Sequence, residues 1–342
     1  MKWTVAAGAV AAVVGSLGVM AASGQTETDR RQSESVTGDA TWAPTGQVLY
    51  GRDQLYVADA DGSGEHALVV EPVAAGAILH GDWSPDGTEV AFEIQGDDVS
   101  VWTVNADGTS PQLRAACTHE PCSQMAEPSW SPDGKQLVVV QYDANADGTW
   151  GRSWLVVVDL ATGATRKVAR TPDDRAFYFP RWSNDGRRIV VEVDYYTDNS
   201  QSEATGTAVA IVSAEASPQQ RVRVVTSPEM LANHPDWHPS KNVIVFSTND
   251  PILFSASSDP SNIWVMRPDG QGMRQLTTSS TDGTLRYGTP SWSPDGSGIV
   301  LIAAYAEENG GSVTEKHPAY LPANGGTPKV LAVRGADPRL RP

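Results

Sequence analysis

The sequence predicts an all-β protein, a six-bladed β-propeller of four-stranded antiparallel blades. Three observations lead to that prediction: a tryptophan-centred phrase recurs six times, most copies carry a tight-turn signal, and β-rich runs flank the turns. The tryptophans follow one another at intervals of 41 to 55 residues. Such self-similarity is typical of stacked supersecondary units. The repeated residues are Trp42, Trp83, Trp130, Trp182, Trp237 and Trp292.

The third copy, Trp130-Ser-Pro-Asp-Gly134, shows how one unit is built. Its proline presets φ, its aspartate can bond its own backbone, and its glycine accepts a left-handed conformation. The apolar run 137–140 follows the turn, which predicts a hairpin. A second hairpin follows in each repeat, as around Arg267-Pro-Asp-Gly270. Two hairpins give four strands, and such small sheets must stack to become stable.

We expect blades to begin near residues 40, 81, 128, 180, 235 and 290. The repeated tryptophans fill the wedge between neighbouring sheets, which is a structural role rather than a ligand-stacking one. Two copies depart from the pattern: Asn184 replaces the proline in one, and His238, Ser240 and Lys241 replace Ser, Asp and Gly in another. Because residues 337–342 resemble a first strand, we expect them to pair with the blade of residues 40–72 and close the ring.

These phrases resemble the TolB-like six-bladed β-propeller family. The residues that carry the resemblance are Pro128–Gly134, Pro290–Gly296, Asn262–Gly270 and Arg274–Thr277. It covers roughly residues 40 to 342 and implies an envelope-associated, protein-binding role. TolB itself carries an α/β domain ahead of its propeller, for which residues 24–40 are too few. The resemblance therefore implies a stand-alone member without that domain, and a Tol–Pal type role does not transfer directly.

The N-terminus predicts export. Lys2 precedes an apolar run over 3–22, and small residues follow at 21–24, so we expect a signal peptide over residues 1–23. The run is long enough to span a bilayer, which leaves an uncleaved anchor as the alternative. Residues 24–39 form a flexible polar lead-in, and the propeller occupies 40–342. Cleavage would leave a protein without membrane contact, either secreted or located in the periplasm or cell envelope.

The net charge limits the classes of binding partner, and the cysteine content bears on the cellular compartment. A net charge of −16 without a basic cluster argues against nucleic acid and anionic membrane surfaces. The two cysteines, Cys117 and Cys122, are close enough in an exported chain to form a disulfide. A metal site made with His119 is the alternative.

Long connections gather on one predicted face of the ring, which we call the loop face. It collects the loops between second and third strands and the interblade loops, whereas the Ser-Pro-Asp-Gly turns open on the opposite turn face. Variable loops on a rigid scaffold are where binding usually occurs. Residues 250–254 add an apolar stretch that either binds a partner or a sugar, or packs on its neighbour. The long segments are 115–127, 143–151, 194–207, 249–262 and 306–317.

Two ligand sites are expected on this face. Asp143, Asn145 and Asp147 match the first half of a calcium loop, although Trp154 at the twelfth position excludes an EF-hand. An ordinary loop rich in Asx turns explains the same residues. The second site is the channel mouth, where one residue per blade should begin the innermost strand. These residues are His80, Glu127, Phe179, His234, Thr289 and Asp337.

At the channel mouth, His80, Glu127, His234 and Asp337 could together hold a divalent transition metal or perform acid–base chemistry. A hydrated polar funnel is the alternative. No cofactor other than calcium or such a metal is suggested.

The leading functional hypothesis is a non-catalytic scaffold that binds a protein or a cell-envelope polysaccharide through the loop face. No catalytic residue is assigned. The alternative is a metal-dependent lyase or hydrolase acting on acidic polysaccharide at the channel mouth, similar to the oligogalacturonate lyases. A peptidase of the prolyl-oligopeptidase type is excluded because the Gly-x-Ser-x-Gly elbow is missing.

Overall fold

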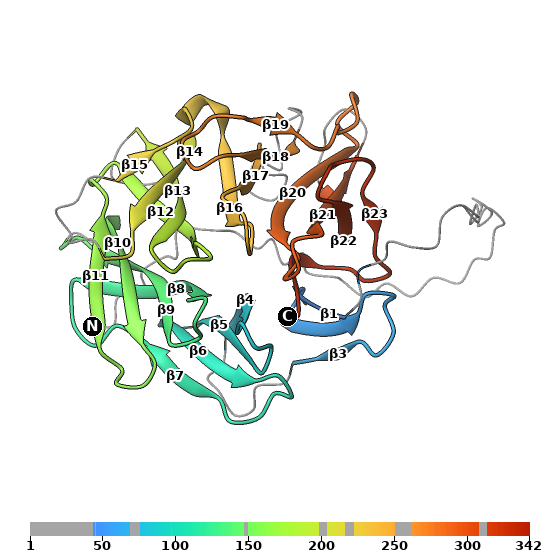
Figure 1. Ribbon diagram of the computed structural model, residues 1–342. Helices are drawn as coiled ribbons and strands as arrows, with labels where there is room; N and C mark the ends of the chain where they lie inside the picture. Colours follow the sequence, from blue (N-terminus) through green and yellow to red (C-terminus); the bar gives the residue numbers. More distant parts are fainter. Residues whose placement is uncertain are drawn as a thin grey trace, which may run out of the picture. The chain divides into compact units, whose positions relative to one another are not determined.

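Six four-stranded antiparallel sheets follow one another along the chain in the computed structural model (Figure 1). The structure describes residues 44, 46–68, 76–96, 98–146, 150–197, 204–215, 222–249, 261–307 and 313–342. These residues contain 24 strands and one short 3-10 turn, η1 (Pro228–Met230). Residues 44–342 form one compact unit. The predicted all-β propeller is confirmed.

In the first three blades, written from the innermost strand outwards, only blade 1 combines the C-terminal strand with strands from the start of the propeller, whereas blades 2 and 3 are continuous. Blade 1 is β24 (Ala336–Leu340), β1 (Gln47–Gly51), β2 (Leu55–Asp59) and β3 (His66–Ala67); blade 2 is β4 (Ala77–Trp83), β5 (Glu89–Gln95), β6 (Val99–Asn105) and β7 (Gln112–Ala115); blade 3 is β8 (Cys122–Trp130), β9 (Gln136–Ala144), β10 (Trp150–Asp159) and β11 (Thr165–Arg170). One parallel bridge between Val99 and Gln124 joins blades 2 and 3 into a continuous sheet.

The other three blades are each built from one continuous stretch of chain. Blade 4 is β12 (Arg175–Trp182), β13 (Arg188–Tyr196), β14 (Ala204–Ser213) and β15 (Arg223–Val224); blade 5 is β16 (Ala232–Trp237), β17 (Ile244–Thr248), β18 (Asn262–Met266) and β19 (Arg274–Gln275); blade 6 is β20 (Leu285–Trp292), β21 (Gly298–Ala306), β22 (Val313–Pro322) and β23 (Lys329–Val330).

The C-terminal strand closes the ring, as predicted. β24 pairs antiparallel with β1, and Leu340 lies opposite Val48 where Trp83 of blade 2 lies opposite Val90. Leu340 therefore occupies the place that tryptophan fills in the other blades. Each innermost strand contacts the next, and β24 contacts both β20 and β4. Trp42, the first repeated tryptophan, lies outside the described residues.

The repeated tryptophans are buried between blades, as expected. Each packs in an apolar cluster made by its own blade and the preceding one, for example Trp83 with Leu49 and Phe92. Sheets of this size are only marginally stable alone, and each tryptophan adds apolar area that is removed from water between two blades. The other tryptophans in such clusters are Trp130, Trp182, Trp237 and Trp292.

The predicted blade starts need correction, because each of these tryptophans ends an innermost strand. The strands of blades 2 to 6 begin at residues 77, 122, 175, 232 and 285. The turn that follows the tryptophan then behaves as predicted. In blade 2 the Ser84 hydroxyl donates to Asp86 at 2.7 Å, and Gly87 adopts a φ of 68°. In the divergent fifth copy, His238 Nδ1 accepts the backbone N–H groups of Ser240 and Lys241 instead.

Candidate functional site

One residue of each innermost strand adopts a left-handed conformation that is uncommon outside glycine. These six residues, which we call the bulge ring, have φ between 43° and 54°. Strand pairing shifts register around each of them, so they lie at β-bulges within the strands and not at the strand starts that the sequence suggested. The bulge ring is His80, Glu127, Phe179, His234, Thr289 and Asp337.

The bulges turn backbone N–H groups toward carboxylates of the preceding blade. Glu93 on β5 accepts the N–H of Glu127 at 2.7 Å, and the Glu127 carboxylate accepts the N–H of Phe179 at 2.7 Å. Glu192 on β13 accepts the N–H of His234 at 2.8 Å. Hydrogen bonds to a buried charge are strong. These acidic groups thereby connect one blade to the next.

Side chains of the bulge ring converge in the channel. Phe179 stacks on His234 with ring centroids 3.9 Å apart, and its edge meets His80 at 5.3 Å. His80 Nδ1 lies 3.1 Å from Glu93 Oε1, and its Nε2 lies 3.8 Å from Asp337 Oδ2. The prediction that these residues lie close together is therefore correct, but the Phe179 ring lies between the imidazoles of His80 and His234.

Burial and charge shift the acidities of this group. Burial opposes protonation of His80, but Glu93, Asp337 and Glu127 outweigh it and raise its pKa to about 9. Burial raises the pKa of Glu127 to about 8, against the attraction of His80. Near neutral pH the channel therefore holds a His80 imidazolium beside the ionised Glu93, whereas Glu127 stays largely protonated.

Among the described residues, no group of three or more His, Cys, Asp or Glu side chains is arranged to hold a metal ion. The four residues proposed for the channel mouth are instead engaged with one another, with Phe179 and with neighbouring backbone. A divalent metal at His80, Glu127, His234 and Asp337 stays a prediction without geometric support.

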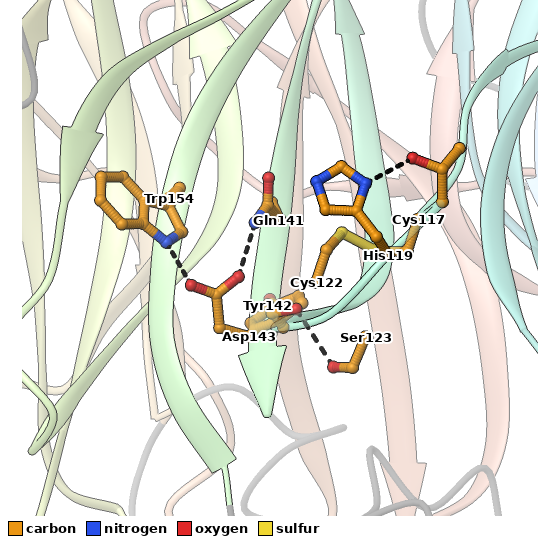
Figure 2. Close-up of a disulfide and its surroundings, with 9 residues drawn as sticks. Cys117, His119, Cys122, Ser123, Gln141, Tyr142, Asp143 and Trp154 are labelled. Atoms are coloured by element: carbon orange, nitrogen blue, oxygen red, sulfur yellow. Dashed lines mark hydrogen bonds between the residues drawn. A yellow bond between two sulfur atoms is a disulfide. The ribbon is translucent and has the colours of Figure 1, made fainter. Parts of the chain in front are cut away.

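The Cys117–Cys122 pair forms the predicted disulfide, in the connection that leads into β8 (Figure 2). His119 points its Nδ1 to the Thr118 hydroxyl at 2.9 Å, so the alternative metal site with this histidine is not formed. The bridge fixes the loop that precedes the innermost strand of blade 3.

The candidate calcium loop is only partly described. The Asp143 carboxylate accepts the Gln141 amide at 2.5 Å and the Trp154 indole N–H at 2.7 Å (Figure 2). Both carboxylate oxygens of Asp143 therefore point toward side chains of β9 and β10 and not into the loop that follows. Asn145 lies in the loop after β9, and Asp147 lies outside the described residues, so the calcium site stays a prediction.

Tyrosines form a second feature of the loop face. The Tyr178 and Tyr196 hydroxyls are 3.0 Å apart, and the Tyr142 ring lies 5.7 Å from that of Tyr178. Tyr195 carries the Arg175 guanidinium over its ring at 4.5 Å. Tyr178, Tyr195 and Tyr196 are half-buried at this end of blade 4. We call Tyr142, Tyr178, Tyr195 and Tyr196 the tyrosine cluster. The apolar stretch at 250–254 lies outside the described residues.

The opposite end of the channel contains a site that the sequence reasoning missed. A cavity of about 280 Å³ is lined there by the residue directly before each blade's tryptophan, or before Leu340. The sequence contains a signal for this site, because the residue at this repeat position is Asp, Ser and Arg in blades 2 to 4 and again Asp, Ser and Arg in blades 5, 6 and 1. These residues, the turn-side ring, are Asp82, Ser129, Arg181, Asp236, Ser291 and Arg339.

Comparisons with known proteins agree with this architecture. No protein-family model matches the chain. A stretch of 87 residues is 33% identical to the Tol-Pal system protein TolB of Escherichia fergusonii, covering 25% of this chain and only 16% of that protein. The TolB structure from Acinetobacter baumannii aligns with a TM-score of 0.61 and 16% identity, over 87% of this chain and 67% of that one.

Two further solved structures extend the comparison. A putative TolB from Agrobacterium tumefaciens aligns with a TM-score of 0.57 and 15% identity, over 85% of this chain and 90% of that one. The chain has a TolB-like propeller fold. An oligogalacturonate lyase in complex with manganese aligns with a TM-score of 0.51 and 16% identity, over 72% of this chain and 63% of that one. At such identities the likeness concerns the fold alone, because one propeller fold hosts many activities.

Proposed function

We propose that this chain is an exported, non-catalytic propeller that binds a protein or a cell-envelope component through its loop face. The carrying observation is the tyrosine cluster, in which Tyr178, Tyr195 and Tyr196 offer half-buried aromatic surface next to the buried Tyr142. Tyrosine is enriched at protein interfaces and at their binding hot spots, because it combines a large apolar ring with a polar tip. The nearby Arg175 adds a cation of the kind found at such hot spots.

The state of the channel supports binding over catalysis. Glu93, Glu127 and Glu192 each accept a backbone N–H from the next blade. A carboxylate that holds the architecture in this way is poorly placed to exchange protons with a substrate. Export is supported by the disulfide, which persists in oxidising compartments, and by the predicted signal peptide. The described residues include no helix long and apolar enough to cross a membrane.

Site-specific photo-crosslinking tests the proposal. A photoreactive phenylalanine analogue replaces Tyr195 in the loop face or, as the control, the exposed Lys135 in the turn between β8 and β9. We expect a discrete adduct with an envelope component in the native cells from position 195 only. A Tyr196→Ala change should weaken that adduct roughly tenfold, as loss of a hot-spot tyrosine does. Equal adducts from both positions, or none from 195, would contradict binding through the loop face.

The enzyme alternative rests on the similarity to the manganese-containing oligogalacturonate lyase and on His80 and His234 in the channel. Its test is incubation with oligogalacturonate and manganese, following the absorbance of unsaturated products. Turnover that disappears in both His80→Gln and His234→Gln variants would replace the scaffold proposal with a lyase. Absorbance that stays flat over time would leave the scaffold as the better account.

A further inference from the structure

Two arginines of the turn-side ring face each other across the channel. Arg181 belongs to blade 4 and Arg339 to blade 1, so they stand on opposite sides of a ring of six. Both line the cavity of about 280 Å³, with exposed fractions of only 8% and 9%. Burial and the charge of Arg181 lower the pKa of Arg339 to about 10. Two like charges buried at one cavity are unfavourable unless opposite charges and hydrogen-bond acceptors lie nearby.

The aspartates of the ring do not fully provide that compensation. Asp236 Oδ2 accepts the backbone N–H of Trp292 at 2.8 Å and the Ser291 hydroxyl at 3.2 Å, and its Oδ1 accepts the backbone N–H of Trp237 at 2.9 Å. Asp82 Oδ2 accepts the backbone N–H of Trp130 at 3.1 Å. These carboxylates are used chiefly to bind one blade to the next, as Glu93 and Glu192 do when they accept backbone N–H groups of the bulge ring.

The guanidinium groups keep unused donors. Arg181 donates one Nη1 bond to the Pro180 carbonyl at 2.9 Å, and Arg339 donates one to the Pro338 carbonyl at 3.1 Å. The Nε of Arg339 has no hydrogen-bond partner, and its nearest carboxylate oxygen, Asp82 Oδ1, is 3.9 Å away. A guanidinium carries five N–H donors, and leaving them unpaired when buried is costly. The cavity therefore holds guanidinium donors that the acceptors in its wall do not fully satisfy.

We propose that the turn-side ring binds a small carboxylate-bearing ligand, with the carboxylate placed between Arg181 and Arg339. Planar carboxylates match the fork of N–H groups on arginine. Tryptophan and proline side chains form the rest of the wall and suit an apolar body on the ligand. A phosphate dianion fits less well, because Asp82 and Asp236 belong to the same ring and repel a second negative charge. This site lies at the opposite end of the channel from the loop face.

Calorimetric titration of the full chain tests the proposal with phenylacetate as the probe. Phenylacetamide, which has the same shape without the charge, and inorganic phosphate are the matched controls at constant ionic strength. We expect heat of binding for phenylacetate and none for phenylacetamide. Phosphate should bind more weakly than the carboxylate. Wild-type protein that treats phenylacetate and phenylacetamide alike would overturn the site, and stronger binding of phosphate would overturn its assignment to carboxylates.

Titrations of substituted proteins test whether phenylacetate binds at the turn-side ring. Replacing either guanidinium, in Arg181→Gln or Arg339→Gln, should weaken phenylacetate at least roughly tenfold, since each removes a charged fork. The control Arg152→Gln, an exposed loop-face arginine paired with Asp173, should bind as the wild type does. Unchanged affinity in the Arg181 variant would overturn the proposal. If Arg339→Gln fails to fold because it lies in the closing strand, Arg181→Gln and the wild-type ligand pair still decide the matter.

Discussion

At the scale of the residue, the bulge ring stands out because six non-glycine residues hold a left-handed backbone. Each such residue costs on the order of 1–3 kcal/mol. The conformation recurs in every blade and turns N–H groups toward Glu93, Glu127 and Glu192. The strain is therefore a property of how this propeller joins its blades, offset by hydrogen bonds to buried acidic side chains, and it does not single out one catalytic residue.

His80 should make stability fall in mildly alkaline solution. Its pKa in the folded protein is raised from 6.5 to about 9 by Glu93, Asp337 and Glu127 against the effect of burial. Its stabilising contribution is thus fully present below pH 6.5 and lost as the pH rises toward 9. Full loss corresponds to about 3 kcal/mol in the free energy of unfolding. Urea unfolding of the wild type between pH 6 and pH 9 measures it.

The His80→Gln variant should show a smaller decrease over the same range, whereas His66→Gln, at an exposed histidine, should behave as the wild type does. Some slope will remain in His80→Gln. Burial raises the pKa of Glu127 from 4.5 to about 8, so its contribution is also lost as the pH rises through that value. Equal slopes for wild type and His80→Gln would show that His80 does not titrate as described.

At the scale of the element, the connection before β8 is fixed by the disulfide (Figure 2). Only five positions separate the two cysteines in sequence. A double Cys117→Ser, Cys122→Ser variant should therefore lose about 2 kcal/mol of stability in the chain-entropy model, a modest amount because the closed loop is short. Chemical denaturation measures the loss, and the far-ultraviolet circular dichroism should stay that of a β protein.

Reduced wild-type protein is the control for that measurement, since it carries free thiols at unchanged positions. It should match the double variant. A reduced protein as stable as the oxidised one would show that the loop is held by its other contacts, such as the bonds between β8 and β9.

At the scale of the whole molecule, β24 joins the two ends of the described propeller. Val48 pairs with Leu340, and the Arg341 side chain donates to Gly87 in blade 2. Deleting residues 336–342 removes an innermost strand and exposes both the β1 edge and the apolar contacts of Leu340. We expect a loss of more than about 3 kcal/mol from ladder bonds and burial together. Thermal unfolding of truncated and full chains measures it.

Deleting Pro342 alone is the matched control, because β24 stays whole. That variant should melt close to the wild-type temperature. If the longer deletion also melts there, the ring does not depend on its closing strand, and the propeller is held by contacts between the remaining blades.

Much of the fold was predictable because its signals are local. The Ser-Pro-Asp-Gly turn fixes a hairpin within a few residues, and its recurrence gave the blade number and the closing strand. The bulge ring could also be found, since each member precedes a proline, or Gly81 in blade 2. At Gly81 an added Cβ would lie 2.7 Å from Leu49 Cδ2, so blade 2 has little room for a side chain at this position. The mid-strand position of these residues was missed, because a bulge depends on pairing with the second strand.

The sequence by itself determined the all-β class, the six repeats, the wedge role of the tryptophans and the Cys117–Cys122 pair, because each follows from turn chemistry or spacing along the chain. Only the tertiary structure decided what meets in the channel. Glu93 and Glu192 reach the next blade from second strands, Phe179 separates His80 from His234, and Arg181 faces Arg339. The reason is physical: such contacts depend on ring closure and bulge geometry, which place distant residues on opposite sides of one axis.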